Sequence, residues 1–176
     1  PGPGACGGQF TANTMSTVCE LLGVSPMAAN GVPAMVAEKD DVAKQAGSLV
    51  LDLVQKDVRP RQIVTADALE NAIAAVATTG GSTNAVLHLL AIAHEAGVDL
   101  KLEDFDRISE QTPLLADLKP GGRFVATDLY RAGGLELVVS RLKEAGLLHT
   151  DAITVTGQTI GDVADSAQET AGQKVV

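Results

Sequence analysis

The sequence predicts an α/β fold in which layered helices cover a mostly parallel β-sheet. Apolar residues recur at helical spacing in several segments, and short stretches with strand-like composition lie between them. Hydrophobic residues make up 45% of the chain, but aromatic residues only 2%, and tryptophan is absent. The core must therefore consist of Ala, Val, Leu and Ile, which favours helices packed on a sheet over a β-sandwich. The length of 176 residues suits one domain with a sizeable core.

The first half of the chain contains two clear helical patterns. Met15, Val18, Cys19 and Leu22 follow the spacing i, i+3, i+4 and i+7, and Gly23 then predicts the end of this helix. A loop is expected over residues 24–37, because it contains two prolines and a glycine. Residues 40–55 form a strongly amphipathic pattern. A short strand is expected at 62–64, after the break at Pro60.

The second half alternates helical patterns with short extended segments. Thr65 and Ser82 are suitable N-caps for two helices, of which the second, 83–95, is apolar nearly all round and is expected to be buried on more than one side. Further helices are expected at 102–109, from Thr127 to about Gly146, and from Thr159 to Val163. The pair Gly133-Gly134 is expected to weaken or interrupt the second of these. Residues 123–126 are expected to be extended, and 153–156 have the best strand composition.

Charge and cysteine content exclude several classes of function. The net charge of −9 and the pI near 4.7 argue against nucleic acid and anionic membranes as partners. No apolar run is long enough to span a bilayer. Two cysteines do not make a disulfide framework, so a reducing compartment is expected. The chain begins without Met and ends at Lys-Val-Val, and we expect an interior piece of a longer protein.

The glycine-rich stretch around Cys6 is the first candidate site. Gly4, Gly7 and Gly8 allow a sharp turn and a close approach of the backbone to whatever Cys6 touches. A helix begins soon afterwards, and its N-terminal dipole and unpaired amides favour a thiolate, which is the form that binds metal or attacks carbon. The alternative is a tight turn with an ordinary buried thiol.

A second candidate is the turn Thr79-Gly-Gly-Ser-Thr-Asn84, which opens a helix. Amides at a helix N-terminus can bind a carboxylate or another anion, with Ser82, Thr83 and Asn84 as candidate ligands. The alternative is a tight turn with a capped helix. The lysine of a nucleotide-binding P-loop is absent.

Three other residues have weaker functional interpretations. His88 lies one turn into the apolar helix and is either near the site or a core histidine with its hydrogen bonds satisfied. Arg131 precedes Gly133-Gly134 and is either a partner for a substrate carboxylate or a surface cation. Cys19 lies on the apolar face of the first helix, thirteen residues after Cys6, and is expected to be a core residue.

The motif Gly4-Ala-Cys6-Gly-Gly-Gln-Phe-Thr-Ala-Asn-Thr-Met15 closely resembles the dihydroxy-acid dehydratase family, which includes sugar-acid and phosphogluconate dehydratases. The resemblance continues through Thr78–His88 and Tyr130–Gly134 to Ala145–Leu148 and covers nearly the whole chain. The residues after Cys6 resemble the branched-chain enzyme more than its sugar-acid relatives. The resemblance implies that residues 1–176 are a single partial domain, the second half of the family's N-terminal α/β domain, without the C-terminal β-barrel domain.

The resemblance also implies an activity and cofactors. Such an enzyme, a hydro-lyase of branched-chain amino-acid biosynthesis, dehydrates 2,3-dihydroxy acids of the 2,3-dihydroxyisovalerate type to 2-keto acids. Cys6 matches a cysteine ligand of an iron–sulfur cluster, with 2Fe–2S favoured and 4Fe–4S also seen in the family. The other cluster ligands, the Mg²⁺ ligands and the catalytic base match positions outside this chain. No catalytic residue is therefore assigned here, and the chain by itself is expected to be inactive.

The family also suggests a homodimer in the bacterial cytoplasm, or in an organelle if the source is eukaryotic. Two alternatives remain open. One is a sugar-acid or phosphogluconate dehydratase of the same family. The other is a fragment that binds no cluster and serves only as a structural or interaction module.

Overall fold

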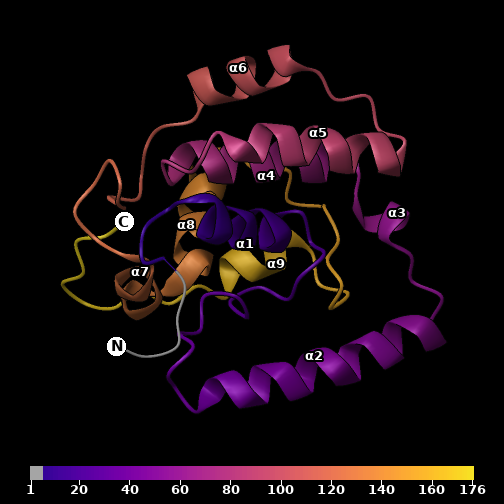
Figure 1. Cartoon of the computed structure of the whole chain (residues 1–176), viewed down its shortest axis with the longest axis horizontal. Coiled ribbons are helices and arrows are strands. Elements are labelled where there is room, and N and C mark those ends of the chain that lie inside the picture. Colours follow the sequence, from indigo (N-terminus) through magenta and orange to yellow (C-terminus); the bar gives the residue numbers. More distant parts are fainter. Residues whose placement is uncertain (1–5) are drawn as a thin grey trace.

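A computed structural model describes residues 6–176 of the chain, and this part is built from helices (Figure 1). The helices are α1 (Thr11–Leu21), α2 (Glu38–Gln55), α3 (Pro60–Ile63), α4 (Ala66–Thr78), α5 (Asn84–Ala96), α6 (Leu102–Gln111), α7 (Ala126–Ala132), α8 (Gly134–Glu144) and α9 (Ile160–Asp165).

The predicted α/β fold is wrong, because residues 6–176 contain no β-sheet. Extended pairing is limited to two isolated bridges, Leu118 with Phe124 and Ile153 with Thr159. Gln62 and Ile63 of the strand expected at 62–64 lie in α3, and Val64 is its C-cap. Pro60 occupies the first turn of this helix, where its missing N–H costs no hydrogen bond. The β-branched segment 153–156 turns back on itself, since the Thr154 amide donates to the Gln158 carbonyl at 2.9 Å.

Helices α1 and α4 pack against each other in the middle of the molecule. Their buried apolar side chains belong to the hydrophobic core. Helix α5 contacts both, α6 packs on the outer side of α4, and α8 contacts α4, α7 and α9 (Figure 1). Helix α4 buries eight of its thirteen residues, including Leu69 and Ile73. The Thr65 cap is confirmed, because its side chain accepts a hydrogen bond from the Ala68 amide at 3.2 Å.

Glycines set two helix boundaries. Gly23 adopts φ of 81° just after α1, and the helix stops before it as predicted. The interruption expected at the Gly-Gly pair in the helix from Thr127 to about Gly146 is confirmed, because Gly133 adopts φ of 138° and separates α7 from α8. No l-residue with a side chain adopts that backbone conformation readily.

Helices α2 and α5 are less buried than their sequences predict. In α5 only Ala85, Leu89 and Ala93 are buried, and Leu87 is 68% exposed, so the expectation of burial on more than one side is wrong. Helix α2 forms where it was predicted but buries none of its residues, and Val54 is 74% exposed. It runs along one edge of the molecule, apart from the central helices (Figure 1).

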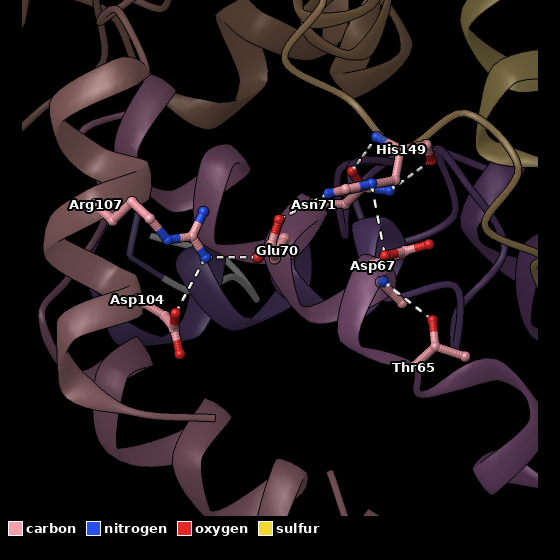
Figure 2. Close-up of polar contacts among 8 residues, drawn as sticks. Thr65, Asp67, Glu70, Asn71, Asp104, Arg107 and His149 are labelled. Carbon is pink, nitrogen blue, oxygen red and sulfur yellow. Dashed lines mark hydrogen bonds and ion pairs between the residues drawn. The ribbon is translucent and has the colours of Figure 1, made fainter. Parts of the chain in front are cut away.

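A polar network on the opposite side joins α4 to α6 and to the segment after α8 (Figure 2). Arg107 of α6 donates to Glu70 of α4 at 2.6 Å and to Asp104 at 3.1 Å. The other Glu70 oxygen lies 2.8 Å from Nε2 of His149. Asn71, which is buried, accepts from the His149 amide at 2.8 Å and donates to its carbonyl at 2.9 Å. These contacts fix the outer helix and the 147–149 segment on α4.

Candidate functional site

Cys6 lines a pocket of about 370 Å³ on the side of α1 that faces the loop before α2. The floor is formed by α1 and the N-terminal loop, and the walls come from three other segments that are distant in sequence. These are Asn30–Met35 with Lys39, then Leu118, and from the α7–α8 region Ala126, Thr127, Leu129, Tyr130, Gly134 and Leu135. The pocket therefore unites two of the motifs that the sequence singled out, the Cys6 stretch and the segment before Gly133-Gly134.

The Cys6 thiol is free and exposed, on a loop that is tightly held. The side-chain amide of Asn13 donates to the carbonyls of Cys6 at 2.6 Å and Gly8 at 2.7 Å. The Gly7 carbonyl accepts from the Ala126 amide at 2.7 Å. A Cβ on Gly8 would lie 2.9 Å from the Phe10 ring and 3.0 Å from the Lys119 carbonyl oxygen, so a larger residue here would have to displace one of these neighbours. Gly4, also predicted in this turn, lies outside the described residues.

Helix α1 presents a polar stripe to the pocket. Asn13, Ser16, Thr17 and Glu20 are spaced i, i+3, i+4 and i+7 and all line it. Glu20 is only 2% exposed, and its two carboxylate oxygens accept from the amides of Ala28 at 3.0 Å and Asn30 at 2.7 Å. Burial raises the pKa of Glu20 to about 7 against the opposing effect of these two hydrogen bonds.

The sequence patterns considered above do not single out Glu20 as a site residue, although its helical spacing with other polar residues points to it. The stripe has the same helical period as the apolar residues of α1, so one face of the helix is polar and must meet something other than core. The apolar positions of the helix do not by themselves reveal this polar face.

The turn before α5 docks on the start of α1. The Ser82 amide donates to Thr14 Oγ1 at 2.9 Å, and the Asn84 side chain donates to Thr11 Oγ1 at 2.6 Å. The amides of residues 84–86 donate to Ser82 and Thr83 within the turn. Ser82 thus supports the start of α5, although Thr83 occupies the N-cap position. Ser82, Thr83 and Asn84 do not line the Cys6 pocket, and anion binding by them stays a prediction.

His88 and Arg131 also lie outside the pocket lining. His88 is exposed on α5, and the Arg131 side chain is 76% exposed, 3.7 Å from Asp128. Its neighbour Tyr130 lines the pocket instead. Cys19 is partly buried on α1, and burial followed by the charge of Glu20 raises the pKa of its thiol. A substrate contact of His88 or Arg131 therefore stays a prediction.

Cys6 fits one position of a metal–thiolate site, because its thiol is exposed and glycines flank it. The donor set is nevertheless incomplete. Residues 6–176 contain no group of three or more His, Cys, Asp or Glu side chains that could hold a metal ion. Over the same residues no helix is both long and apolar enough to cross a membrane.

Comparison with known proteins shows the family of the chain. A family model described as "Dihydroxy-acid/6-phosphogluconate dehydratase N-terminal" matches residues 1–163. A dihydroxy-acid dehydratase of Koribacter versatilis is 66% identical over 176 residues, which are 100% of this chain and 31% of the relative. Those of Roseiflexus sp. and Thermus thermophilus are 56% and 54% identical over 100% of this chain and 32% of each relative.

The chain thus spans about a third of the length of the curated relatives that it matches. The match runs through the Cys6 loop, the turn at 79–84 and the α7–α8 region alike, since it covers all but the last residues. The chain therefore belongs to the dihydroxy-acid/6-phosphogluconate dehydratase family.

Proposed function

We propose that this chain is part of a dihydroxy-acid dehydratase, a hydro-lyase that converts a 2,3-dihydroxy acid of the 2,3-dihydroxyisovalerate type to a 2-keto acid in branched-chain amino-acid biosynthesis. Relatives of that name, 66% to 54% identical over the whole chain, support the activity. The single structural observation that carries it is the position of Cys6, an exposed thiol on a rigid loop at the edge of a pocket.

The reaction removes a proton from C2 and the hydroxyl from C3. These leave together as water, and the resulting enol becomes the 2-keto acid by moving a proton from the C2 hydroxyl oxygen to C3. The C3 hydroxyl is a poor leaving group, and the C2 proton is weakly acidic. An iron–sulfur cluster of 2Fe–2S or 4Fe–4S type, bound in part by Cys6, would supply Lewis acidity toward that hydroxyl.

The residues of this chain build one side of the site. Asn13 holds the Cys6 loop through two carbonyls, which fixes the backbone that carries the thiol. The aliphatic and small residues from Gly31 to Met35 line the same pocket. Mg²⁺, expected from the family resemblance, would need carboxylate ligands from outside this chain, as would the remaining cluster ligands and the base.

Substrate turnover by the full-length protein tests this proposal. The anaerobically purified enzyme is incubated with 2,3-dihydroxyisovalerate, 6-phosphogluconate and a sugar acid, and 2-keto acid formation is followed. We expect turnover of 2,3-dihydroxyisovalerate to dominate. Turnover of 6-phosphogluconate or the sugar acid alone would assign the other branch of the family. A protein without iron and without turnover of any of them would indicate a structural or interaction module.

We also propose a homodimer in a reducing, cytoplasmic compartment. Two unpaired cysteines, one of them exposed, are compatible with a reducing environment. Light scattering on the full-length protein tests the dimer, and a monomeric mass would contradict it.

A further inference from the structure

The loop between α1 and α2 is held from two sides at residues 28–30. From α1, Glu20 accepts hydrogen bonds from the amides of Ala28 and Asn30 at 3.0 Å and 2.7 Å. From α2, the Lys39 ammonium donates to the intervening Ala29 carbonyl at 3.1 Å. One backbone group from each of three successive residues is thus bound, alternately by the carboxylate and the ammonium. We call these two side chains, Glu20 and Lys39, the loop clasp.

The loop conformation depends on these contacts. Ala28 has φ of 66°, a left-handed conformation that is strained for a residue with a Cβ. Such conformations persist only where the surroundings enforce them, and they are concentrated at functional sites. The side chain of Asn30 adds hydrogen bonds to the Ser16 carbonyl at 3.2 Å and to Ser25 Oγ at 3.0 Å.

The clasped segment leads directly into a wall of the Cys6 pocket. Asn30, Gly31 and the residues through Met35 line the pocket together with Cys6 and Glu20. A shift of residues 28–30 would therefore change the shape of the pocket. Each carboxylate oxygen of Glu20 accepts a hydrogen bond from a loop amide, so the group is directed at the loop.

We propose that Glu20 is a positioning residue, which acts with Lys39 to fix the 28–35 loop as one wall of the Cys6 pocket. The functional meaning of this wall rests on the dehydratase proposal above, whereas the clasp itself does not. In Glu20→Gln one acceptor oxygen becomes an NH₂ group that faces an amide donor, so one of the two loop contacts is lost.

The test is made on the full-length protein. Hydrogen exchange is measured at the amides of Ala28 and Asn30, and the alkylation rate of the Cys6 peptide is measured with iodoacetamide in the cluster-free form. For Glu20→Gln we expect at least about tenfold faster exchange at both amides and severalfold faster alkylation of Cys6. In the loaded enzyme we expect KM for 2,3-dihydroxyisovalerate to rise more than kcat falls.

Two variants of Lys39 extend the test, because this residue lies on the exposed helix α2 and its replacement does not endanger folding. Lys39→Met should give a smaller change of the same sign, and Lys39→Arg, which keeps a donor, should restore protection of the loop. Asn71→Ala is the matched control. Asn71 is equally buried and bridges two segments through two hydrogen bonds, but it does not line the pocket.

Unchanged exchange at Ala28 and Asn30 in Glu20→Gln would overturn the proposal, as would an Asn71→Ala variant with the same changes in Cys6 alkylation and KM. The experiments distinguish failure of the dehydratase proposal from failure of the loop-clasp proposal. A wild-type protein that dehydrates no dihydroxy acid would remove the proposed function, while the exchange and alkylation results would still decide whether the clasp exists.

Discussion

At the residue scale, Glu20 combines deep burial with a carboxyl group that titrates near neutrality. Desolvation raises its pKa to about 7, and the charge of Glu136 adds to this effect, while the amides of Asn30 and Ala28 and the charge of Lys39 oppose it. Folding therefore favours the protonated form. The contribution of this group to stability is complete below the unfolded pKa of about 4.5 and is lost as the pH rises through about 7.

This linkage predicts a pH-dependent difference between the wild type and Glu20→Gln. The free energy of unfolding of the wild type, relative to the variant, should fall by on the order of 1–3 kcal/mol between pH 4.5 and pH 8. Denaturant unfolding at several pH values measures it. Glu110→Gln, at an exposed position of α6, should leave the pH profile unchanged. A relative stability that rises with pH would contradict the assignment.

At the element scale, the break between α7 and α8 depends on one glycine. A Cβ on Gly133 would lie 2.3 Å from the backbone oxygen of Gln168, and its φ of 138° is strained for any residue with a side chain. We expect Gly133→Ala to lower the free energy of unfolding by about 2 kcal/mol or more.

Thermal or denaturant unfolding of that variant is compared with Gly47→Ala. A Cβ at Gly47, within α2, would meet nothing within 4 Å, so this substitution should stabilise by about 0.5–1 kcal/mol. Equal effects of the two substitutions would show that the α7–α8 break does not require glycine.

The unequal burial of α4 and α2 gives a second prediction at this scale. Leu69 of α4 is fully buried, so Leu69→Ala should cost about 2–5 kcal/mol. Val54 of α2 is 74% exposed, and Val54→Ala should change the stability of this chain by less than about 0.5 kcal/mol. A cost of several kcal/mol at Val54 would show that another surface covers α2.

Local sequence patterns predict the helices well, because capping and periodicity are local properties. Thr65 and Thr159 cap their helices as expected, and Phe105 and Ile108 of α6 are buried together. The failures are non-local. The segment 153–156 has strand composition, but a strand needs a partner, and here the Thr154 side chain instead accepts from the Thr156 amide and donates to the Gln158 carbonyl within a turn. The exposure of α2 is likewise invisible in its own amphipathic pattern.

The sequence predicts one part of the site and not the other. The Cys6 motif is recognisable in the sequence, and the structure places it at a pocket. The clasp on residues 28–30 could not be predicted, since it depends on Glu20 and Lys39 meeting one loop from two different helices.

At the scale of the whole molecule, the network around Glu70 joins three segments of the chain (Figure 2). Burial tends to raise the pKa of Glu70, but hydrogen bonds and charges from Arg107 and His149 outweigh it and hold this pKa below its ordinary value. The stabilisation is therefore present above the unfolded pKa and is lost as the pH falls through the folded one.

We expect the loss of stability on acidification below about pH 4.5 to be weaker in Glu70→Gln than in the wild type. The difference should be below about 1 kcal/mol, because the ion pair with Arg107 is partly exposed, at 46% and 30% of the two side chains. Asp99→Asn, in the more exposed pair with Lys101, is the control and should have no measurable effect. A stronger acid dependence in Glu70→Gln would be the contrary result.

The most direct measurement of the central claim is the iron and acid-labile sulfide content of the full-length protein, with its visible spectrum and dehydratase activity, for wild type, Cys6→Ser and Cys19→Ser. Cys19 is the matched control, because it is the partly buried thiol on α1 and does not line the pocket. We predict that Cys6→Ser loses or destabilises the cluster together with activity, while Cys19→Ser retains both. Equal iron in all three proteins, or none in the wild type, would contradict the assignment of Cys6 as a cluster ligand.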